Sequence, residues 1–386
     1  MKREYLSFMC CPECQSQMVV DGEANEKQII ETGSITCVAE TCGQTYPIIN
    51  AVPRFVNNGK YANSFGQQWR SFAKTQLDGS QTRDSKVRWD SEVTWNAEDL
   101  SGKTIIEFGS GAGRFMDVVS KLGVKLAIGI DITDAVDASQ ENLRERGNCF
   151  FIQADFFKLP IKQSSMDFGY SIGVLHHTPD PEKAFRQLVN AVSKNGSVAL
   201  GLYDISLYRR PNRNGLKVVT MELLWAINAW RCEFFRLFTI RLPEKPFLLY
   251  CKTVVPVLHC LNKIPVIGLL RYFLPSTCYK HMPVEWSMVD THDTYVTKIV
   301  HQYRAKDVFQ WFLRAHLYNI VATNSRAGWV SLVATKDPSM RLQHDKYIRN
   351  QPYAPGIEGG FSQDVVTEES PYALERMTEL VKRLDQ

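Results

Sequence analysis

The chain has 386 residues, of which 44% are hydrophobic and 22% charged, and its net charge is +4 at pH 7. This length suggests two or three folded units, and the small net charge does not by itself argue for a nucleic-acid binder. No uncharged apolar run of about 18 residues occurs, so we expect no membrane-spanning helix. The N-terminal sequence MKREYLSFMCCPEC lacks the apolar stretch of a secretory signal, and we expect a cytoplasmic protein.

The cysteines are concentrated near the N-terminus, where five of the ten fall within the first 42 residues. Cys11 and Cys14 form a Cys-x2-Cys pair, and Cys37 and Cys42 form a second pair with wider spacing. Two such pairs can give four thiolates to one tetrahedral zinc, which would be structural because no coordination position stays open. Cys10 could compete with Cys11, and reduced free thiols or an iron site are the alternatives. The remaining cysteines suggest buried thiols in a reducing compartment.

The segment YPIINAVPRFV at residues 46–56 follows the second cysteine pair. Together with the two pairs, it resembles the zinc-ribbon domain of the small activator subunit that partners several tRNA and protein methyltransferases. The resemblance covers about residues 8–57 and departs from the family in the wide second pair. It implies a zinc-ribbon domain at residues 1–57, fused to the rest of the chain.

Residues 58–100 are polar and are predicted to link this domain to the next one. Phe65, Trp69 and Phe72 share one face of a helix, which would pack on the main domain or act as a lid over a ligand. The FGxQW pattern resembles a segment of zinc-ribbon-fused bacterial methyltransferases. In that reading, Gln68 or Trp69 approaches the methionine end of an S-adenosylmethionine cofactor.

A strand, a glycine-rich loop, a helix and a second strand are predicted between residues 104 and 131, from the segments TIIEFGSGAG and KLAIGID. The first strand contains Glu107 near its end, and the second is followed by Asp131, which could accept hydrogen bonds from both hydroxyls of a ribose. Glycines let the backbone approach a ligand without Cβ clashes. Those of the loop are Gly109, Gly111 and Gly113.

This glycine pattern differs from a nicotinamide-binding loop, whose third glycine would stand at position 114, where this chain has Arg114. It resembles motif I of the class I S-adenosylmethionine-dependent methyltransferases. The alternative is a structural turn in another nucleotide-binding fold. The resemblance implies that S-adenosylmethionine is the cofactor.

Strand and helix patterns alternate from residue 101 to residue 203, which predicts an α/β fold with a parallel sheet covered by helices on both faces. The predicted strands are 104–108, 126–130, 149–153, 166–172 and 197–202, and the helices include 114–122 and 181–193. A helix at 305–316 and strands at 319–323 and 328–334 would complete a Rossmann-like class I methyltransferase sheet. We therefore assign residues 101–203 and 290–336 to a methyltransferase domain.

Polar residues follow the third and fourth strands, where ligands bind in such sheets. Asp155 could accept a hydrogen bond from an adenine amine and Phe156 could stack on the base, or Asp155 could cap the next turn. The sequence GVLHHTPDP from Gly173 onward resembles small-molecule class I methyltransferases. The resemblance implies that Gly173 lies along the methionine part of the cofactor. His176 and His177 would then face the methyl-transfer site and could act as a general base, or merely hold the loop.

Residues 204–289 break this rhythm and are predicted to be a helical lid inserted after the fifth strand. Aromatic and basic residues mix at 216–275, so a helical cap or a weak membrane-surface contact are further interpretations. His292, Asp293 and His301 lie where the insertion rejoins the core and could meet a substrate, although a solvated loop is the simpler reading. Residues 337–386 are predicted to be a largely irregular tail.

The patterns together predict an S-adenosylmethionine-dependent methyltransferase acting on a small molecule or biosynthetic intermediate. An RNA methyltransferase that uses the zinc ribbon to contact RNA is one alternative, and a non-catalytic cofactor-binding scaffold is another. The acceptor atom, whether O, N or C, is not encoded in any motif, and neither is the oligomeric state.

Overall fold

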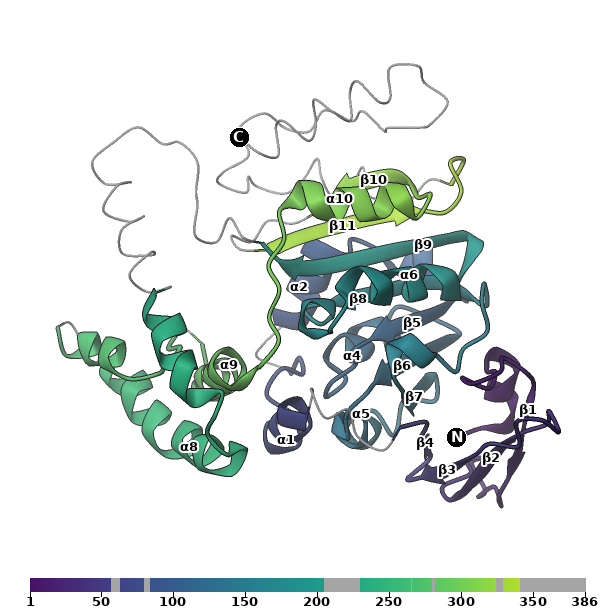
Figure 1. Cartoon of the computed structure of the whole chain (residues 1–386), viewed down its shortest axis with the longest axis horizontal. Coiled ribbons are helices and arrows are strands. Elements are labelled where there is room, and N and C mark those ends of the chain that lie inside the picture. Colours follow the sequence, from purple (N-terminus) through teal and green to yellow (C-terminus); the bar gives the residue numbers. More distant parts are fainter. Residues whose placement is uncertain are drawn as a thin grey trace.

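The computed structural model describes residues 1–56, 63–79, 84–204, 230–264, 266–279, 282–323 and 329–340. A central sheet carries helices on both faces, with a small N-terminal sheet at one end and a group of helices at the other (Figure 1). The predicted tail lies outside the described residues from 341 onward, as does the first part of the predicted insertion, residues 205–229.

In the described part of the chain, seven strands form the central sheet in the order β10-β11-β9-β8-β5-β6-β7. The strands β9, β8, β5, β6 and β7 run parallel to one another, whereas β11 is antiparallel to both β9 and β10. The predicted Rossmann-like α/β fold with a closing hairpin is therefore confirmed. Its strands are β5 (Thr104–Phe108), β6 (Leu126–Asp131), β7 (Cys149–Gln153), β8 (Met166–Ile172), β9 (Val192–Tyr203), β10 (Tyr318–Ala322) and β11 (Trp329–Thr335).

Helices cover both faces of this sheet, which is why its parallel strands are apolar along nearly their whole length. Helices α6 and α10 pack on one face, and α2, α4 and α5 lie on the other. The helices predicted at 114–122, 181–193 and 305–316 each end two residues earlier than expected. The bounds are α2 (Asp84–Glu92), α3 (Ala97–Leu100), α4 (Arg114–Ser120), α5 (Ala135–Asn142), α6 (Pro181–Ala191) and α10 (Ala305–Arg314), with short η2 (Phe156–Lys158) and η3 (Leu175–His177).

The N-terminal residues form their own antiparallel sheet in the order β1-β2-β3-β4. It continues the central sheet through a parallel bridge between Arg54 and Gln153, at the end of β7. The backbone amide of Phe55 donates to the carbonyl oxygen of Gln153 at 2.8 Å, and the Arg54 guanidinium forms an ion pair with Asp137. Its elements are η1 (Arg3–Phe8), β1 (Met18–Asp21), β2 (Gly33–Cys37), β3 (Thr45–Ile49) and β4 (Val52–Pro53).

The helices at the other end of the molecule are called the cap below. The cap comprises helical residues 230–239, α8 (Glu244–Leu261), η5 (Ile267–Phe273) and α9 (Val284–Val296). Its small core contains Phe247, Cys251 and Tyr295. Helix α1 (Asn63–Ser71) packs between α5 of the main domain and α9 of the cap. Within the described residues, none of the helices has both the length and the apolar character needed to cross a bilayer.

The boundary predicted between residues 289 and 290 falls inside α9, which continues to Val296. The run DTHDTY suggested a loop because it is polar, but its side chains make tertiary contacts within a helix. His292 is 1% exposed, and its Nδ1 lies 2.9 Å from the side-chain oxygen of Gln68 in α1. The solvated-loop reading is therefore wrong for His292 and Asp293, which belong to the inner side of the cap.

Candidate active site

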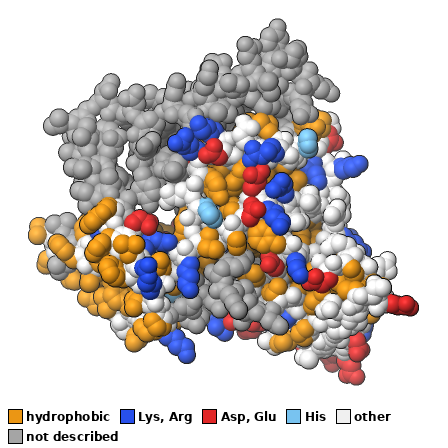
Figure 2. Space-filling view, in the orientation of Figure 1, with side chains coloured by type: hydrophobic (Ala, Val, Ile, Leu, Met, Phe, Trp, Pro, Cys, Tyr) orange, Lys and Arg blue, Asp and Glu red, His pale blue; other side chains and the backbone are white. Residues whose placement is uncertain are grey.

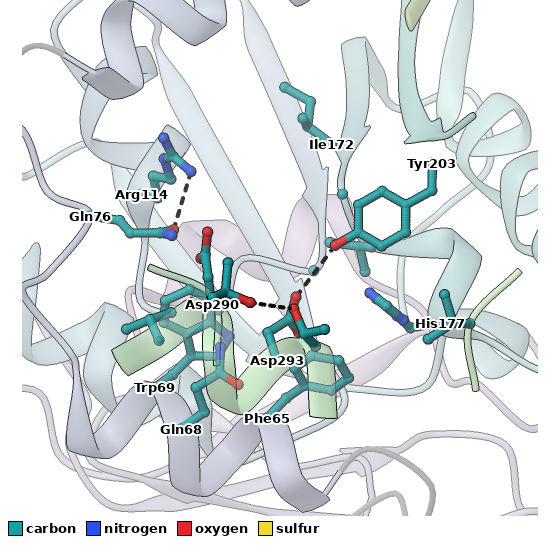
Figure 3. Close-up of a pocket in the computed structure, with 18 of the residues that line it drawn as sticks. Phe65, Gln68, Trp69, Gln76, Arg114, Ile172, His177, Tyr203, Asp290 and Asp293 are labelled. Atoms are coloured by element: carbon teal, nitrogen blue, oxygen red, sulfur yellow. Dashed lines mark hydrogen bonds between the residues drawn. The ribbon is translucent and has the colours of Figure 1, made fainter. Parts of the chain in front are cut away.

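A cavity of about 880 Å³ lies at the carboxyl ends of the parallel strands, bounded by the sheet, α1 and the cap. Side chains from α1, α9 and the ends of β8 and β9 converge on it (Figure 3). Among the residues predicted to bind the cofactor or to catalyse, those that line it are Glu107, Gly109, Gly111, Asp131, Phe156, Gly173 and His177. Phe65, Gln68, Trp69 and Asp293, which the sequence analysis also named, line it as well. Of the predicted cofactor and catalytic residues, Gly113, Asp155 and His176 lie outside this lining.

The glycine-rich loop between β5 and α4 is closely covered on both sides. A Cβ on Gly109 would lie 2.3 Å from a methyl carbon of Val174, and one on Gly111 would lie 3.1 Å from the indole nitrogen of Trp69. Both glycines have positive φ angles, of 83° and 50°. Any larger residue at either position would displace the neighbouring side chain and strain the backbone. Gly113 has a different role, because it begins α4 at a φ of 87°.

Asp131 fixes this loop to the end of β6. Its carboxylate accepts hydrogen bonds from the backbone amide of Gly111 at 2.9 Å and from the amide and hydroxyl of Thr133 at 2.9 and 2.8 Å. Burial raises the pKa of Asp131, although these donors act in the opposite direction. The carboxylate therefore both shapes the loop and lines the cavity.

Glu107 is the second acid at this end of the cavity. It is 3% exposed, and its Oε2 atom has no hydrogen-bond partner among the described residues. Burial raises its pKa well above the usual range, and the neighbouring Asp131 adds to the effect. A buried carboxylate oxygen without a partner is costly, so a cationic or hydrogen-bond-donating ligand at this position would stabilise it.

The end of β7 presents an aromatic ring to the cavity. The ring of Phe156 stacks on Phe108, with centroids 4.6 Å apart and planes 5° from parallel. The carboxylate of Asp155 accepts from the backbone amide of Phe157 at 2.9 Å and caps the short helix η2. The structure thus shows the capping role that was the alternative for Asp155, while its contact with adenine stays a prediction.

The two histidines after β8 differ in their surroundings. His177 is 9% exposed and lines the cavity, whereas His176 is fully buried, with its ring stacked 3.9 Å from that of Tyr203. The Nδ1 of His177 lies 2.8 Å from the carbonyl oxygen of Ile299, so Nδ1 must carry the hydrogen and Nε2 is left as an acceptor. Burial lowers the pKa of His177 to about 4, and that of His176 well below its usual value. Both are therefore neutral at pH 7.

Helix α9 contributes two carboxylates, of which Asp293 was considered as a substrate contact in the sequence analysis and Asp290 was not. Asp290 and Asp293 are three residues apart on a helix, so they share a face, and both line the cavity. Tyr279 donates a hydrogen bond to Asp290, and Tyr203 donates to Asp293 at 3.3 Å. Burial raises the pKa of each aspartate to about 6. The signal in the sequence was the spacing of the acids, which had been assigned to a loop.

Arg88 in α2 also reaches the cavity, and no motif had indicated it. Its Nε donates to Glu92 at 2.7 Å, and its guanidinium lies 4.1 Å from the ring centre of Trp329. The Nη2 atom is buried and has no hydrogen-bond partner among the described residues. The cap end of the cavity therefore combines hydrogen-bond donors, carboxylates and aromatic rings, a mixture suited to a polar acceptor molecule.

The four cysteines predicted as metal ligands come together in the N-terminal sheet. Their sulfur atoms all lie within 4.8 Å of one another, and Cys11 to Cys42 and Cys14 to Cys37 measure 3.7 and 3.4 Å. A tetrahedral zinc with Zn–S bonds of about 2.3 Å needs sulfurs about 3.8 Å apart. The donor set therefore fits zinc in both chemistry and spacing. Cys10 is buried beside the cluster, and its thiol donates to the side chain of Gln15 at 3.2 Å.

Residues 106–200 match a family model described as a methyltransferase domain. The matched segment runs from β5 into β9 and is about a quarter of the chain. It contains the glycine loop, Asp131, Phe156 and the histidine pair. The chain therefore contains a methyltransferase domain, and the expected enzyme class is confirmed for that domain.

Individual relatives cover only parts of the chain. The tRNA U34 carboxymethyltransferase of Ruthia magnifica subsp. Calyptogena magnifica is 27% identical over 176 residues, which are 42% of this chain and 52% of the relative. The ribosomal protein L11 methyltransferase of Erwinia tasmaniensis is 47% identical over 57 residues, 14% of this chain and 20% of the relative. The chain thus spans about half the length of the first of these relatives.

Among solved structures, an S-adenosylmethionine-dependent methyltransferase from Mesorhizobium loti aligns with 61% of this chain and 91% of its own. The sequence identity is 14% and the TM-score is 0.35. A likeness this weak does not bear on the substrate.

Proposed function

We propose that this protein is an S-adenosylmethionine-dependent methyltransferase whose acceptor is a small polar molecule held between the sheet and the cap. The observation that carries the proposal is the continuous cavity from the glycine loop to Asp290 and Asp293. Its volume of about 880 Å³ is within the range of pockets that enclose small ligands. A cavity of this size between the sheet, α1 and the cap favours a small acceptor over a macromolecule.

The cofactor would occupy the end of the cavity beside the glycine loop. Glu107 and Asp131 put two carboxylates there, which suits a ligand that carries a sulfonium and an ammonium group. When bound, the cofactor would supply an electrophilic methyl group. The residues proposed to hold it are those predicted from the sequence: Glu107, Gly109, Gly111, Gly113, Asp131, Asp155, Phe156 and Gly173. The lining of the cavity supports each of these except Gly113 and Asp155.

The acceptor would lie toward the cap, where His177, Tyr203 and Asp293 meet. The Nε2 of His177 is an unprotonated acceptor at neutral pH and could take the proton of a hydroxyl as it attacks the methyl group. His176 does not line the cavity, so His177 is the better placed of the two predicted bases to contact the acceptor. For an amine acceptor, orientation within the cavity would supply most of the catalysis.

The four clustered cysteines would hold a structural zinc, since four thiolates fill its coordination sphere. The proposed kinship of residues 1–57 with the activator's zinc ribbon is supported by the small antiparallel sheet around this cluster and by its continuation into β7. In this proposal the ribbon stabilises the methyltransferase domain and takes no part in the chemistry.

The test begins with cofactor binding, measured by calorimetry on the purified full-length chain. Methyl transfer from labelled S-adenosylmethionine would then be assayed in parallel on a pool of small polar metabolites and on bulk tRNA. Label in the small-molecule fraction is expected. Absence of cofactor binding at millimolar concentration would overturn the proposal.

An RNA acceptor is the second candidate, because a tRNA-modifying enzyme is among the relatives. Label in tRNA, together with a gel shift that weakens steeply with salt, would support it against the small acceptor. Tight cofactor binding without label in either fraction would instead favour the non-catalytic scaffold.

A further inference from the structure

The cap helix at residues 230–239 is amphipathic, and its apolar outer face is uncovered. Trp230, Phe234, Leu237 and Phe238 follow helical spacing along one side and are 69%, 43%, 55% and 58% exposed. The ring centroids of Trp230 and Phe234 and of Phe234 and Phe238 are each 5.5 Å apart, so the rings form a ladder. The surface of a soluble protein rarely exposes such a row of aromatic rings unless it binds another molecule or a membrane.

The inner face of the same helix is firmly attached to α9. The hydroxyl of Thr239 donates to the carbonyl oxygen of Tyr295 at 2.6 Å, and Arg236 donates to the carbonyl of Thr297 at 2.9 Å. The ring of Phe235 packs near that of Tyr295, at a centroid distance of 6.4 Å. The orientation of the helix is therefore set by its inner contacts, which hold the aromatic ladder outward.

The rest of the cap extends this apolar surface. Of the seventeen exposed large hydrophobic residues found in the described ranges, thirteen lie between residues 230 and 274. Figure 2 shows hydrophobic side chains gathered over the cap, with basic side chains among them. We call this surface the apolar patch. Besides the four on the helix above, its members are Leu242, Leu249, Val257, Ile264, Val266, Ile267, Tyr272, Phe273 and Leu274.

Residues 230–279, which include every element of the cap except α9, are basic. Residues 230–279 contain seven Lys and Arg against two Glu, a net charge of +5, compared with +4 for the whole chain. Arg241, Lys245, Lys252 and Lys263 are exposed and lie in the same stretch as the apolar patch. Exposed aromatic rings surrounded by basic side chains match the interface of an anionic bilayer, which offers negative head groups above an apolar layer.

We propose that the cap docks on the surface of an anionic lipid bilayer through the apolar patch and its basic rim. A second copy of the chain fits the patch less well, because the exposed Arg241, Lys245, Lys252 and Lys263 of the two copies would repel each other. Tyr272 belongs to the patch and also lines the cavity, so the membrane-facing surface reaches the edge of the proposed active site. If the proposed methyltransferase function holds, this arrangement favours, as the small polar acceptor, a head group presented at the surface of the bilayer.

The proposal can be tested without cofactor or acceptor, so it can fail independently of the proposed function. The full-length chain would be floated with vesicles of phosphatidylcholine containing about one third phosphatidylglycerol, and with vesicles of phosphatidylcholine alone. Binding to the anionic vesicles is expected to exceed binding to the neutral ones. Phe234→Ser/Phe238→Ser should reduce it by about tenfold or more, because each ring loses the free energy of burial. The matched control is Val19→Ser/Ile49→Ser, which removes equally exposed apolar side chains from the N-terminal sheet.

The basic rim, formed by Arg241, Lys245, Lys252 and Lys263, allows a second and independent test. Lys245→Glu/Lys252→Glu should weaken binding to anionic vesicles and leave binding to neutral ones unchanged. Lys103→Glu/Lys125→Glu, an exposed pair on the main domain, should have little effect. Absence of vesicle binding by the wild type, or equal losses in the patch variant and its control, would overturn the proposal. So would a concentration-dependent dimer that Phe234→Ser/Phe238→Ser abolishes and that binds no vesicles.

Discussion

Asp131→Ala should strongly weaken the binding of S-adenosylmethionine. The carboxylate accepts three hydrogen bonds within the protein, from the Gly111 amide and from the amide and hydroxyl of Thr133. Its loss would free the glycine loop and remove the proposed contact with the ribose. One lost hydrogen bond to a charged group costs about 1.5–3 kcal/mol. The dissociation constant should therefore rise roughly 10- to 150-fold.

Two further variants distinguish the effect of Asp131 on the conformation of the glycine loop from its proposed contact with the cofactor. Asp131→Asn keeps one acceptor oxygen and should fall between Asp131→Ala and the wild type. Thr133→Val removes one donor to the carboxylate but keeps its charge, so it should weaken binding by less than about tenfold. Calorimetry with the cofactor measures each constant, and Asp21→Ala, at an exposed position on β1, is the control. Unchanged affinity in Asp131→Ala, with an unchanged circular dichroism spectrum, would refute the placement of the cofactor.

Three other predictions concern the metal, the base and the cap. The purified chain should contain one zinc, and Cys14→Ser should lose it while the main domain still binds cofactor; metal analysis that finds none in the wild type would rule out the metal site. If the acceptor is a hydroxyl, His177→Ala should lower kcat by about 10²–10⁴. The acid limb of the wild-type rate should lie near pH 4, because burial lowers the pKa of His177 to about that value; a limb near 6.5 would contradict this. Burial raises the pKa of Asp293 to about 6, above the value of about 3.9 for an unfolded aspartate, so its ionisation destabilises the fold as pH rises through 6. Asp293→Asn should therefore raise the melting temperature at pH 8 but not at pH 4, relative to wild type, and an equal shift at both values would count against a buried charge.

The central sheet was predictable because its strands are short apolar runs separated by amphipathic helices. Each predicted strand overlaps an observed one, and β9 differs most, since it begins at Val192 instead of residue 197. The cysteine spacing likewise predicted the cluster, because two short pairs bring their own sulfurs together. In these cases the residues that determine the structure lie close together in the sequence, within one strand, one helix or one short cysteine pair.

The cap end of the site could not be predicted because its contacts are between distant parts of the chain. Polar residues such as Asp290 and His292 suggest a loop when they are considered alone. They are accommodated in a helix here because Tyr279 hydrogen-bonds to Asp290 and Gln68 to His292 inside the protein. Arg88 belongs to the site because α2 packs beside α4, which no local pattern specifies.

The bridge from Arg54 to Gln153 ties the N-terminal sheet to the edge of the central sheet, so removing that sheet would affect the rest of the protein. Strand β7 is the outermost strand of the central sheet on that side, and an uncovered outer strand invites pairing with other molecules. The N-terminal sheet covers part of this edge by donating the Phe55 amide to it. Removing residues 1–57 would therefore expose hydrogen-bonding groups that other chains can use. We expect the truncated protein to aggregate even if its cofactor site is intact, so that solubility, rather than catalysis, would be the first property lost.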